Sequence, residues 1–403
     1  MKRGSGIKLI ITLVLIAAAV FFSIQPIQEN INLGLDLQGG ASVLLQAIPQ
    51  EGQTITTEDM EKLTAVMRNR VDEFGVAEPI IQREGEDRLI VELAGIENPD
   101  EAIEMLGKTA RLEFKDPSGE VILTGADLAN SSAMIDSITG QNVVTLEFTE
   151  EGAKKFASAT ARLVGQEISI YLDDALLQNP VVNGPILDGN AQIQGGFTTF
   201  EDAANIAALL RGGALPVDIE ILSKSTVGPT LGQDSLDKSF RAIIIGLVAL
   251  AVFMIAYYRL PGLLANISLI VYALLLLWIL SLIHATLTLP GIAGFVLSMG
   301  MAVDSNIIIY ERLKEELRAG KTLRVAVEAG FKRALSTILD ANITTLIAAL
   351  VLFQFGTGSI QGFALILAIG LVVSLVTAIF FTRMMLRWTV QVPAFNNPKL
   401  YKA

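Results

Sequence analysis

The chain has 403 residues, of which 52% are apolar and 18% charged, and its mean hydropathy is +0.53. This composition is too apolar for an ordinary soluble domain and indicates several membrane spans. The absence of cysteine excludes disulfides, thiolate metal ligands and cysteine nucleophiles. No soluble segment carries the clustered Lys and Arg of a nucleic-acid footprint, so we expect no nucleic-acid partner.

Charge is distributed unevenly along the chain. Residues 27–238 contain 35 acidic and 14 basic side chains, whereas the remainder contains 6 acidic and 16 basic ones. The sequence therefore predicts an acidic polar domain joined to a basic membrane domain.

Six apolar runs are long enough to cross a hydrocarbon core of ~30 Å as helices, which takes ~20 residues. They are Ile7–Ile24, Phe240–Tyr258, Leu263–Ile283, Leu289–Tyr310, Ala334–Phe355 and Phe363–Met385. The first run has a basic start and the small residues 17–19, so a cleaved signal peptide is the alternative. The run continues past those small residues and is long for a signal core, which favours a span.

The basic residues set the expected orientation. Lys and Arg precede the first span, fill the loop between the fourth and fifth, and follow the sixth. By the positive-inside rule these segments are cytoplasmic, so both termini lie inside the cell membrane and residues 27–238 outside. The predicted divisions are a terminus with the first span (1–26), an extracytoplasmic domain (27–238), five further spans (239–388) and a cytoplasmic tail (389–403).

The segment between the first two spans alternates strand and helix patterns. Gly39-Gly40 interrupts its first strand, which suggests a bulge; Thr57 and Asn98 are placed to cap helices. The expected elements are a strand at Asn32–Ile48, a helix at Thr57–Phe74, a hairpin at Ile80–Leu93, a helix at Pro99–Leu106, a strand at Ala110–Phe114, a helix at Phe200–Leu210 and a strand at Val217–Leu222. This order predicts a split βαβ, ferredoxin-like α+β base (about 27–115 and 197–238) with an inserted head lobe (about 116–196).

Enzymatic chemistry is not indicated in this domain. Asp173-Asp174 follows a strand and is best explained as a turn, because adjacent strand residues point to opposite faces. The glycines of LGLDLQGG lack the lysine of a phosphate-binding loop. The single histidine, His284, lies at the outer end of the third span. We therefore expect no catalytic residue, no metal and no cofactor.

The fourth span contains GMAVDSNIIIYE, residues 300–311, with Asp304 about 22 Å along the helix from Leu289. A carboxylate at bilayer depth costs at least ~2.5 kcal/mol even on the mildest insertion scale. Ser305 and Asn306 follow it. In the fifth span, Asn342, Thr344 and Thr345 are candidates to hydrogen-bond a carboxylate of a neighbouring helix.

Small residues line two sides of the fourth span. Gly294, Ser298 and Ala302 form one stripe, together with Gly291 and Ser305. Gly300, with Ala293, lies on the same side as Asp304. Small residues let helix backbones approach closely, so we expect a central helix with neighbours on more than one side and an aspartate that does not face lipid.

Two interpretations of Asp304 remain open. It is either a buried acid held permanently by hydrogen bonds, or a protonation site, since burial in an apolar medium raises a carboxyl pKa toward neutrality. No Lys or Arg lies inside any span to hold it ionised. We favour the proton relay, with Asp304 as its main residue. Asp340, near the basic residues 332 and 333, is better explained as structural.

Four ordered stretches resemble the SecD family, which is the larger half of the SecDF protein-export factor in the RND superfamily. They are NLGLDLQGG, TVGPTLG, GMAVDSNIIIYERLKEE and ANITTLIAALVLFQFGTGSIQGFA. The resemblance implies a polytopic α-helical protein with six spans in an RND half-transporter arrangement and a large extracytoplasmic α+β domain. The family's proton-carrying aspartate falls on Asp304, and the residue after it, commonly Ala, is Ser305 here.

The resemblance also implies partners and a task. SecD pairs with SecF, a second six-span protein that carries the basic and second acidic intramembrane residues, and associates with the SecYEG channel. It draws unfolded preproteins outward after the ATPase SecA has pushed them, driven by proton flow. Two alternatives stay open: an RND-type proton-coupled exporter of small molecules or lipids, and a passive tether that binds unfolded chains.

Overall fold

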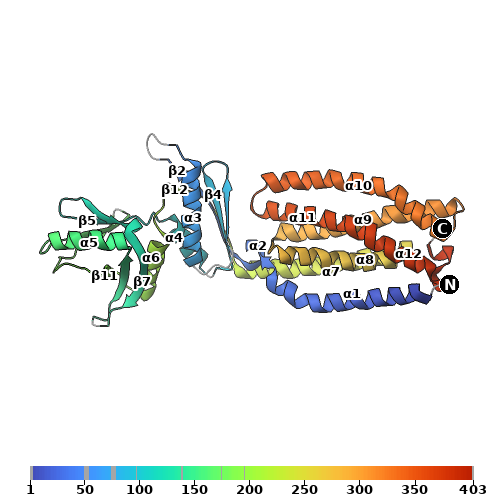
Figure 1. The fold of residues 1–403 in the computed structure, drawn as a ribbon, viewed down its shortest axis with the longest axis horizontal. Coiled ribbons are helices and arrows are strands. Elements are labelled where there is room, and N and C mark those ends of the chain that lie inside the picture. The colour runs from blue at the N-terminus through green and yellow to red at the C-terminus, as the bar shows by residue number, and fades with distance from the viewer. Residues whose placement is uncertain are drawn as a thin grey trace. The chain divides into compact units, whose positions relative to one another are not determined.

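The computed structural model describes residues 3–49, 54–73, 79–96, 98–137, 139–173, 175–194 and 196–401 (Figure 1). The chain divides into two compact units. The membrane unit comprises Met1–Gln38 and Thr230–Ala403, and the α+β unit comprises Gly39–Pro229. The predicted acidic domain, 27–238, extends further on both sides, into helices that belong to the membrane unit.

The base of the α+β unit is a four-stranded antiparallel sheet with two helices. Its elements are β2 (Gly40–Ile48), α3 (Thr57–Glu73), β3 (Ile80–Glu84), β4 (Arg88–Ala94), α4 (Pro99–Gly107) and β12 (Asp218–Val227), and the strand order is β12-β2-β4-β3. The first two strands of this series are separated in the sheet by the third, which is the split βαβ arrangement. The predicted ferredoxin-like base is therefore confirmed, as are the hairpin and both helices.

Residue periodicity explains the core of the base. Ala41, Val43, Leu45 and Ala47 alternate along β2 and are buried on one face of the sheet. Residues at helical spacing on α3 complete this core, namely Met60, Leu63, Met67 and Val71. Thr56, rather than Thr57, caps α3, since its hydroxyl accepts from the backbone N–H of Asp59 at 3.2 Å.

The head of the α+β unit contains two sheets around one apolar core. The sheets have the orders β10-β9-β5-β6 and β11-β8-β7, and α5 and α6 contribute to the same core. The elements are β5 (Leu112–Lys115), β6 (Val121–Thr124), β7 (Leu128–Ile135), β8 (Asn142–Phe148), α5 (Glu150–Arg162), β9 (Ser169–Leu172), β10 (Ala175–Gln178), β11 (Asn190–Gln194) and α6 (Phe200–Gly212).

Three details differ from the sequence-based expectations. The strand β5 and the helix α6, placed in the base from the sequence, pack in the head instead, because their apolar residues join its core. The predicted bulged strand at Asn32–Ile48 is two strands, β1 (Asn32–Leu33) and β2, separated by the one-turn helix α2 (Leu35–Gln38). Asn98 makes no side-chain cap to α4.

The membrane unit contains six helical segments, found among the described residues, that are long and apolar enough to cross a membrane. They are built from α1 (Arg3–Asn30), α7 (Pro229–Tyr258), α8 (Leu260–Leu282), α9 (Leu289–Arg318), α10 (Leu323–Phe355) and the continuous segment of α11 (Gly358–Val376), the π-helical turn η2 (Thr377–Thr382) and α12 (Arg383–Gln391). The predicted number of spans is confirmed. The chain is thus a multi-pass membrane protein, with six candidate spans among its described residues.

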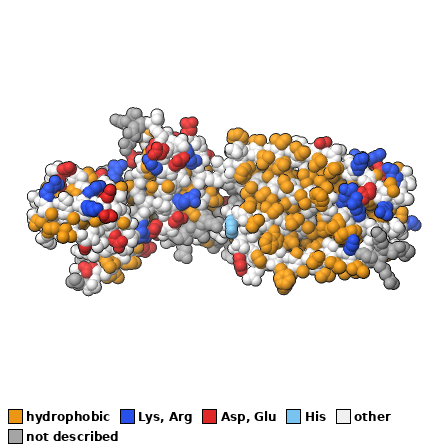
Figure 2. Space-filling view, viewed as in Figure 1, with side chains coloured by type: hydrophobic (Ala, Val, Ile, Leu, Met, Phe, Trp, Pro, Cys, Tyr) orange, Lys and Arg blue, Asp and Glu red, His pale blue; other side chains and the backbone are white. Residues whose placement is uncertain are grey.

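The surface of the membrane unit separates apolar and basic side chains. On the face that Figure 2 shows, hydrophobic side chains form a broad band, and Lys and Arg gather at one end. Both ends of the chain lie at that same basic end (Figure 1). Among the helices, α9 packs against α8, α10 and α11, so it occupies a central position.

Candidate functional site

The helix that carries Asp304 has well-defined ends. Thr288 caps α9 by accepting a hydrogen bond from the N–H of Gly291 at 3.1 Å, and Pro290 occupies its first turn. The helix continues beyond its apolar run to Arg318, and Gly320 follows with a φ of +84°, a value that suits glycine. Asp304 therefore lies near the middle of a rigid 30-residue helix.

One side of α9 is packed very closely against α11. A Cβ added to Gly294 would lie 3.0 Å from the Phe363 ring, and one added to Gly370 would lie 2.7 Å from Ser298. The hydroxyl of Ser298 accepts a hydrogen bond from the Tyr272 hydroxyl at 2.7 Å. This contact explains why small residues recur at Gly291, Gly294, Ser298, Ala302 and Ser305, all of which are buried.

The other small-residue side of α9 is open. Asp304 is exposed at the surface of this chain, as is Leu297 on the same side of the helix. No atom lies within 4 Å of a Cβ built on Gly300. Among the residues that the structure describes, none forms a hydrogen bond or ion pair with the Asp304 carboxylate. Helices of this chain therefore cover one of the two predicted small-residue faces and leave the face with the aspartate uncovered.

The polar residues expected to support Asp304 bond to their own helices. Ser305 and Asn306 donate to main-chain carbonyls four residues earlier in α9. On α10, Asn342 donates to Ile338 O at 2.7 Å, Thr344 to Asp340 O at 2.8 Å and Thr345 to Ala341 O at 3.1 Å. The structure therefore does not bring these side chains together with the carboxylate within this chain.

Two polar atoms lie on the buried side of α9, one on Asn306 and one on Tyr310, a residue that the sequence did not single out. Asn306 Oδ1 and the Tyr310 hydroxyl are buried, and neither has a hydrogen-bond partner among the described residues. Buried polar groups of this kind are commonly satisfied by ordered water. Their spacing of four residues places them on one helix face. Tyr310 is the last residue of the stretch GMAVDSNIIIY, so its spacing of four residues from Asn306 could have been recognised in the sequence.

The α+β unit contains a buried charge of a different kind. The side chain of Arg70, on α3, is 2% exposed and donates to five main-chain carbonyls, those of residues 105, 106, 108, 109 and 213. Burial lowers the pKa of Arg70 to about 10, so the guanidinium stays protonated at neutral pH. Through these bonds, Arg70 joins the two chain segments that run between base and head, one at residues 105–109 and the other at residue 213.

Family models match this architecture from α3 to α12. Residues 60–119 match the model of the SecDF P1 domain, N-terminal part; residues 107–217 match the SecDF P1 head subdomain; and residues 209–392 match the SecD/SecF C-terminal model of protein export membrane proteins. The head model begins at residue 107 and so includes β5 and α6, in agreement with their packing.

Relatives of similar length extend this match over the whole chain. The protein translocase subunit SecD of Acidaminococcus fermentans is 49% identical over 100% of this chain and 96% of its own length. That of Dictyoglomus turgidum is 46% identical over 90% of this chain and 91% of its own. This chain belongs to the SecD family of protein translocase subunits.

A solved structure agrees with this assignment. The crystal structure of SecDF, a translocon-associated membrane protein from Thermus thermophilus, is 38% identical and superposes with a TM-score of 0.64. The match covers 96% of this chain and 59% of that one, so this chain spans a little over half of the SecDF polypeptide. The membrane fold and the α+β unit described above are thus those of the SecD part.

Proposed function

We propose that this chain is the SecD half of a proton-driven export motor that promotes late translocation and release of preproteins on the outer side of the membrane. The observation that carries the proposal is the position of Asp304, at bilayer depth on the one small-residue face that this chain leaves open. If lipid covered this face, an ionised carboxylate there would cost free energy. A second membrane subunit, SecF, would cover the face and supply the basic and acidic groups that this chain lacks.

In this proposal, Asp304 takes up a proton from one side of the membrane and releases it to the other. The change of charge alters which arrangement of α9 and the partner helix is favoured, and the α+β unit moves in response. The cycle needs no bound cofactor, since the proton gradient supplies the free energy. Asn306 Oδ1 and the Tyr310 hydroxyl, which have no hydrogen-bond partner among the described residues, would bind water on the buried side of the same helix.

The available energy limits how the motor works. One proton crossing 100 mV supplies ~2.3 kcal/mol, which shifts a two-state equilibrium by about 50-fold. A shift from 1:99 to 99:1 needs ~5.5 kcal/mol. The cycle therefore uses several protons, or its two states differ little in free energy.

The orientation follows from the basic end of the membrane unit. With that end and both termini in the cytoplasm, the α+β unit lies outside the cell membrane, where a chain emerges from the SecYEG channel after SecA has acted. The head contains an apolar cavity of about 530 Å³, lined by Phe114, Phe156 and Ile170, which suits an apolar segment of an unfolded chain. It would also suit a small apolar molecule, the cargo of the alternative exporter.

The test uses membrane vesicles that contain the export channel, this chain and its partner, with an imposed proton gradient. Asp304→Asn is expected to abolish gradient-dependent release of exported protein, because the amide cannot exchange a proton. Asp340→Asn, the same change on the exposed side of α10, serves as the control and is expected to retain release. Unchanged release by Asp304→Asn would contradict the proposal.

Deletion of the gene distinguishes protein export from export of small apolar molecules. The export motor predicts accumulation of unprocessed or membrane-trapped secreted proteins. The alternative predicts raised sensitivity to apolar toxic compounds with normal secretion.

A further inference from the structure

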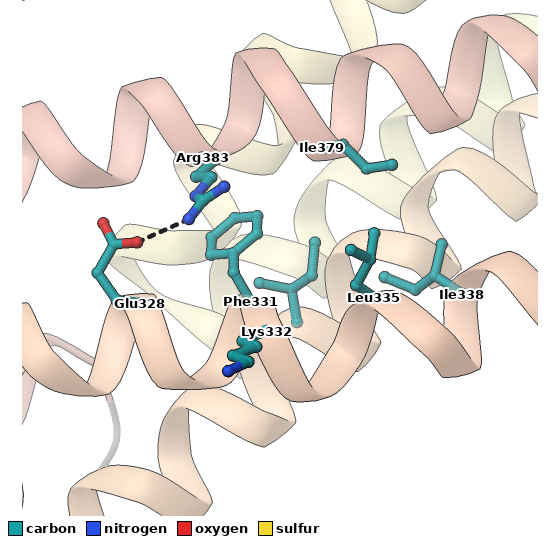
Figure 3. Close-up of a pocket in the computed structure, with 8 residues that line it drawn as sticks. Glu328, Phe331, Lys332, Leu335, Ile338, Ile379 and Arg383 are labelled. Atoms are coloured by element: carbon teal, nitrogen blue, oxygen red, sulfur yellow. Dashed lines mark hydrogen bonds and ion pairs between the residues drawn. The ribbon is translucent and has the colours of Figure 1, made fainter.

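A cavity of about 280 Å³ opens among α9, α10, η2 and α12, and eight residues line it (Figure 3). This volume is about nine times the ~30 Å³ that one water molecule occupies in the liquid. The cavity belongs neither to the face of Asp304 nor to the seam between α9 and α11. A molecule bound in this cavity would therefore be distinct from whatever covers either of those two surfaces.

The walls of the cavity are charged at one end and apolar at the other. Glu328 and Arg383 form an ion pair at the charged end, and the Phe331 ring stands beside them (Figure 3). Beyond the ring, the lining is made by Leu335, Ile338 and Ile379. Glu328 and Ile338 are ten residues apart on one helix, which corresponds to ~15 Å along its axis.

The charged end carries an excess of positive charge. Glu328 accepts hydrogen bonds from both Arg383, at 2.7 Å, and Arg387, so a single carboxylate serves two guanidinium groups. Lys332 also lines the cavity and has no ion-pair partner among the described residues. The side chain of Arg383 is 39% exposed even though it pairs with Glu328. The charged end thus has two accessible cations, Lys332 and Arg383, for an anion.

The depth of the two ends matches the layers of a bilayer. The apolar run of α10 begins at Ala334, so Glu328 and Lys332 lie at the level of the lipid headgroups. Leu335 and Ile338 lie within the hydrocarbon. The π-helical turn η2 precedes Arg383 and sets the direction in which α12 presents it.

We propose that this cavity binds an anionic phospholipid of the cytoplasmic leaflet. The phosphate lies on Arg383, with Lys332 as a second, flexible cation, and one acyl chain passes the Phe331 ring to contact Leu335, Ile338 and Ile379. Glu328 holds the two guanidinium groups in position. Basic pockets between membrane helices on the cytoplasmic side are suited to such headgroups. The bound lipid would join α10 to α12. This inference does not depend on the function proposed for Asp304.

The experiment measures lipid binding to the purified full chain by native mass spectrometry. Phosphatidylglycerol and phosphatidylcholine of equal acyl length are the probes. We expect phosphatidylglycerol to bind more tightly, and Lys332→Gln and Arg383→Gln each to weaken it about fivefold. Arg312→Gln removes the same charge from an exposed ion pair on α9, outside the cavity, and is expected to leave binding unchanged.

The apolar end is tested with Leu335→Trp, which fills it. This variant is expected to weaken phosphatidylglycerol binding at least fivefold, whereas Leu350→Trp, on the exposed surface of α10, has no effect. If Arg383→Gln fails to fold, Lys332→Gln and Leu335→Trp carry the test, since neither breaks an ion pair. Equal binding of the two lipids, normal binding by Leu335→Trp, or full competition by soluble glycerol phosphate would overturn the proposal.

Discussion

Arg70 in the α+β unit and Asp304 in the membrane unit are both charges in positions where a charge is costly, yet their surroundings differ. Arg70 is enclosed by its own chain and donates to five carbonyls. Asp304 is exposed on its own chain and has no partner among the described residues. The comparison distinguishes a charge that is structural from one that is functional. The first makes five hydrogen bonds within the fold and leaves its buried Nε without a partner among the described residues, while the second requires something that the fold does not contain.

The largest effect is expected when the hydrogen bonds of Arg70 are removed. Arg70→Met leaves several buried carbonyls without donors, so it should destabilise the α+β unit by about 3–5 kcal/mol. Hydrogen exchange of β2 and α4 in the full chain, measured against urea concentration, reports the change. Arg68→Met, an exposed position on the same helix, is the control. A loss below about 1 kcal/mol for Arg70→Met would show that its carbonyls find other partners.

A smaller effect is expected from substitutions that compare the two small-residue faces of α9. Gly370→Ala places a Cβ 2.7 Å from Ser298 and the Tyr272 hydroxyl, so it should destabilise the membrane unit by about 1–3 kcal/mol. Gly300→Ala meets no atom within 4 Å and should leave the isolated chain unchanged. Thermal unfolding in detergent measures both. With SecF present, Gly300→Ala should weaken the association of the two proteins. Equal effects of both variants on the isolated chain would contradict the open face.

The smallest effect concerns a carboxylate that does have partners. Asp127 in the head accepts from Lys155 Nζ at 2.7 Å and from the N–H of Thr124 at 3.0 Å. Burial alone would raise the pKa of Asp127, but these bonds outweigh it and hold that pKa below its usual value. Because the folded pKa is lowered, the stabilisation is complete above the ordinary pKa near 4 and is lost as the pH falls through the folded value.

Asp127→Asn should therefore destabilise the head by about 1 kcal/mol at neutral pH, and the difference from the parent should shrink on acidification. Hydrogen exchange of α5 at several pH values measures it. Asp100→Asn removes a highly exposed carboxylate, whose ion pair contributes little, and should have no effect at any pH. A difference for Asp127→Asn that grows as the pH falls would contradict the assignment.

Much of the fold could be predicted from the sequence because its signals are local. Apolar length defines the six spans, and alternation in β2 with helical spacing in α3 defines the base. The placement of α6 could not be predicted, since its capping residues define a helix but not the sheet against which the helix packs. A tertiary core decides that choice.

The candidate site was predictable only in part. Helical spacing placed Asp304 and Gly300 on one face of α9, but spacing cannot show which chain covers a face. The side chains of Asn342, Thr344 and Thr345 were expected to turn toward a carboxylate, whereas main-chain carbonyls of their own helix lie nearer. Arg70 was missed, although a charge at a core position of an amphipathic helix was a visible signal.

The central claim is that the exposed carboxylate of Asp304 exchanges protons when its partner covers it. Proton flux into vesicles that contain the assembled pair, measured with an internal pH dye under an imposed gradient, tests this most directly. The account predicts that Asp304→Asn reduces the flux to the level of empty vesicles, whereas Asp340→Asn leaves it unchanged. A flux through Asp304→Asn equal to that of the parent would contradict it.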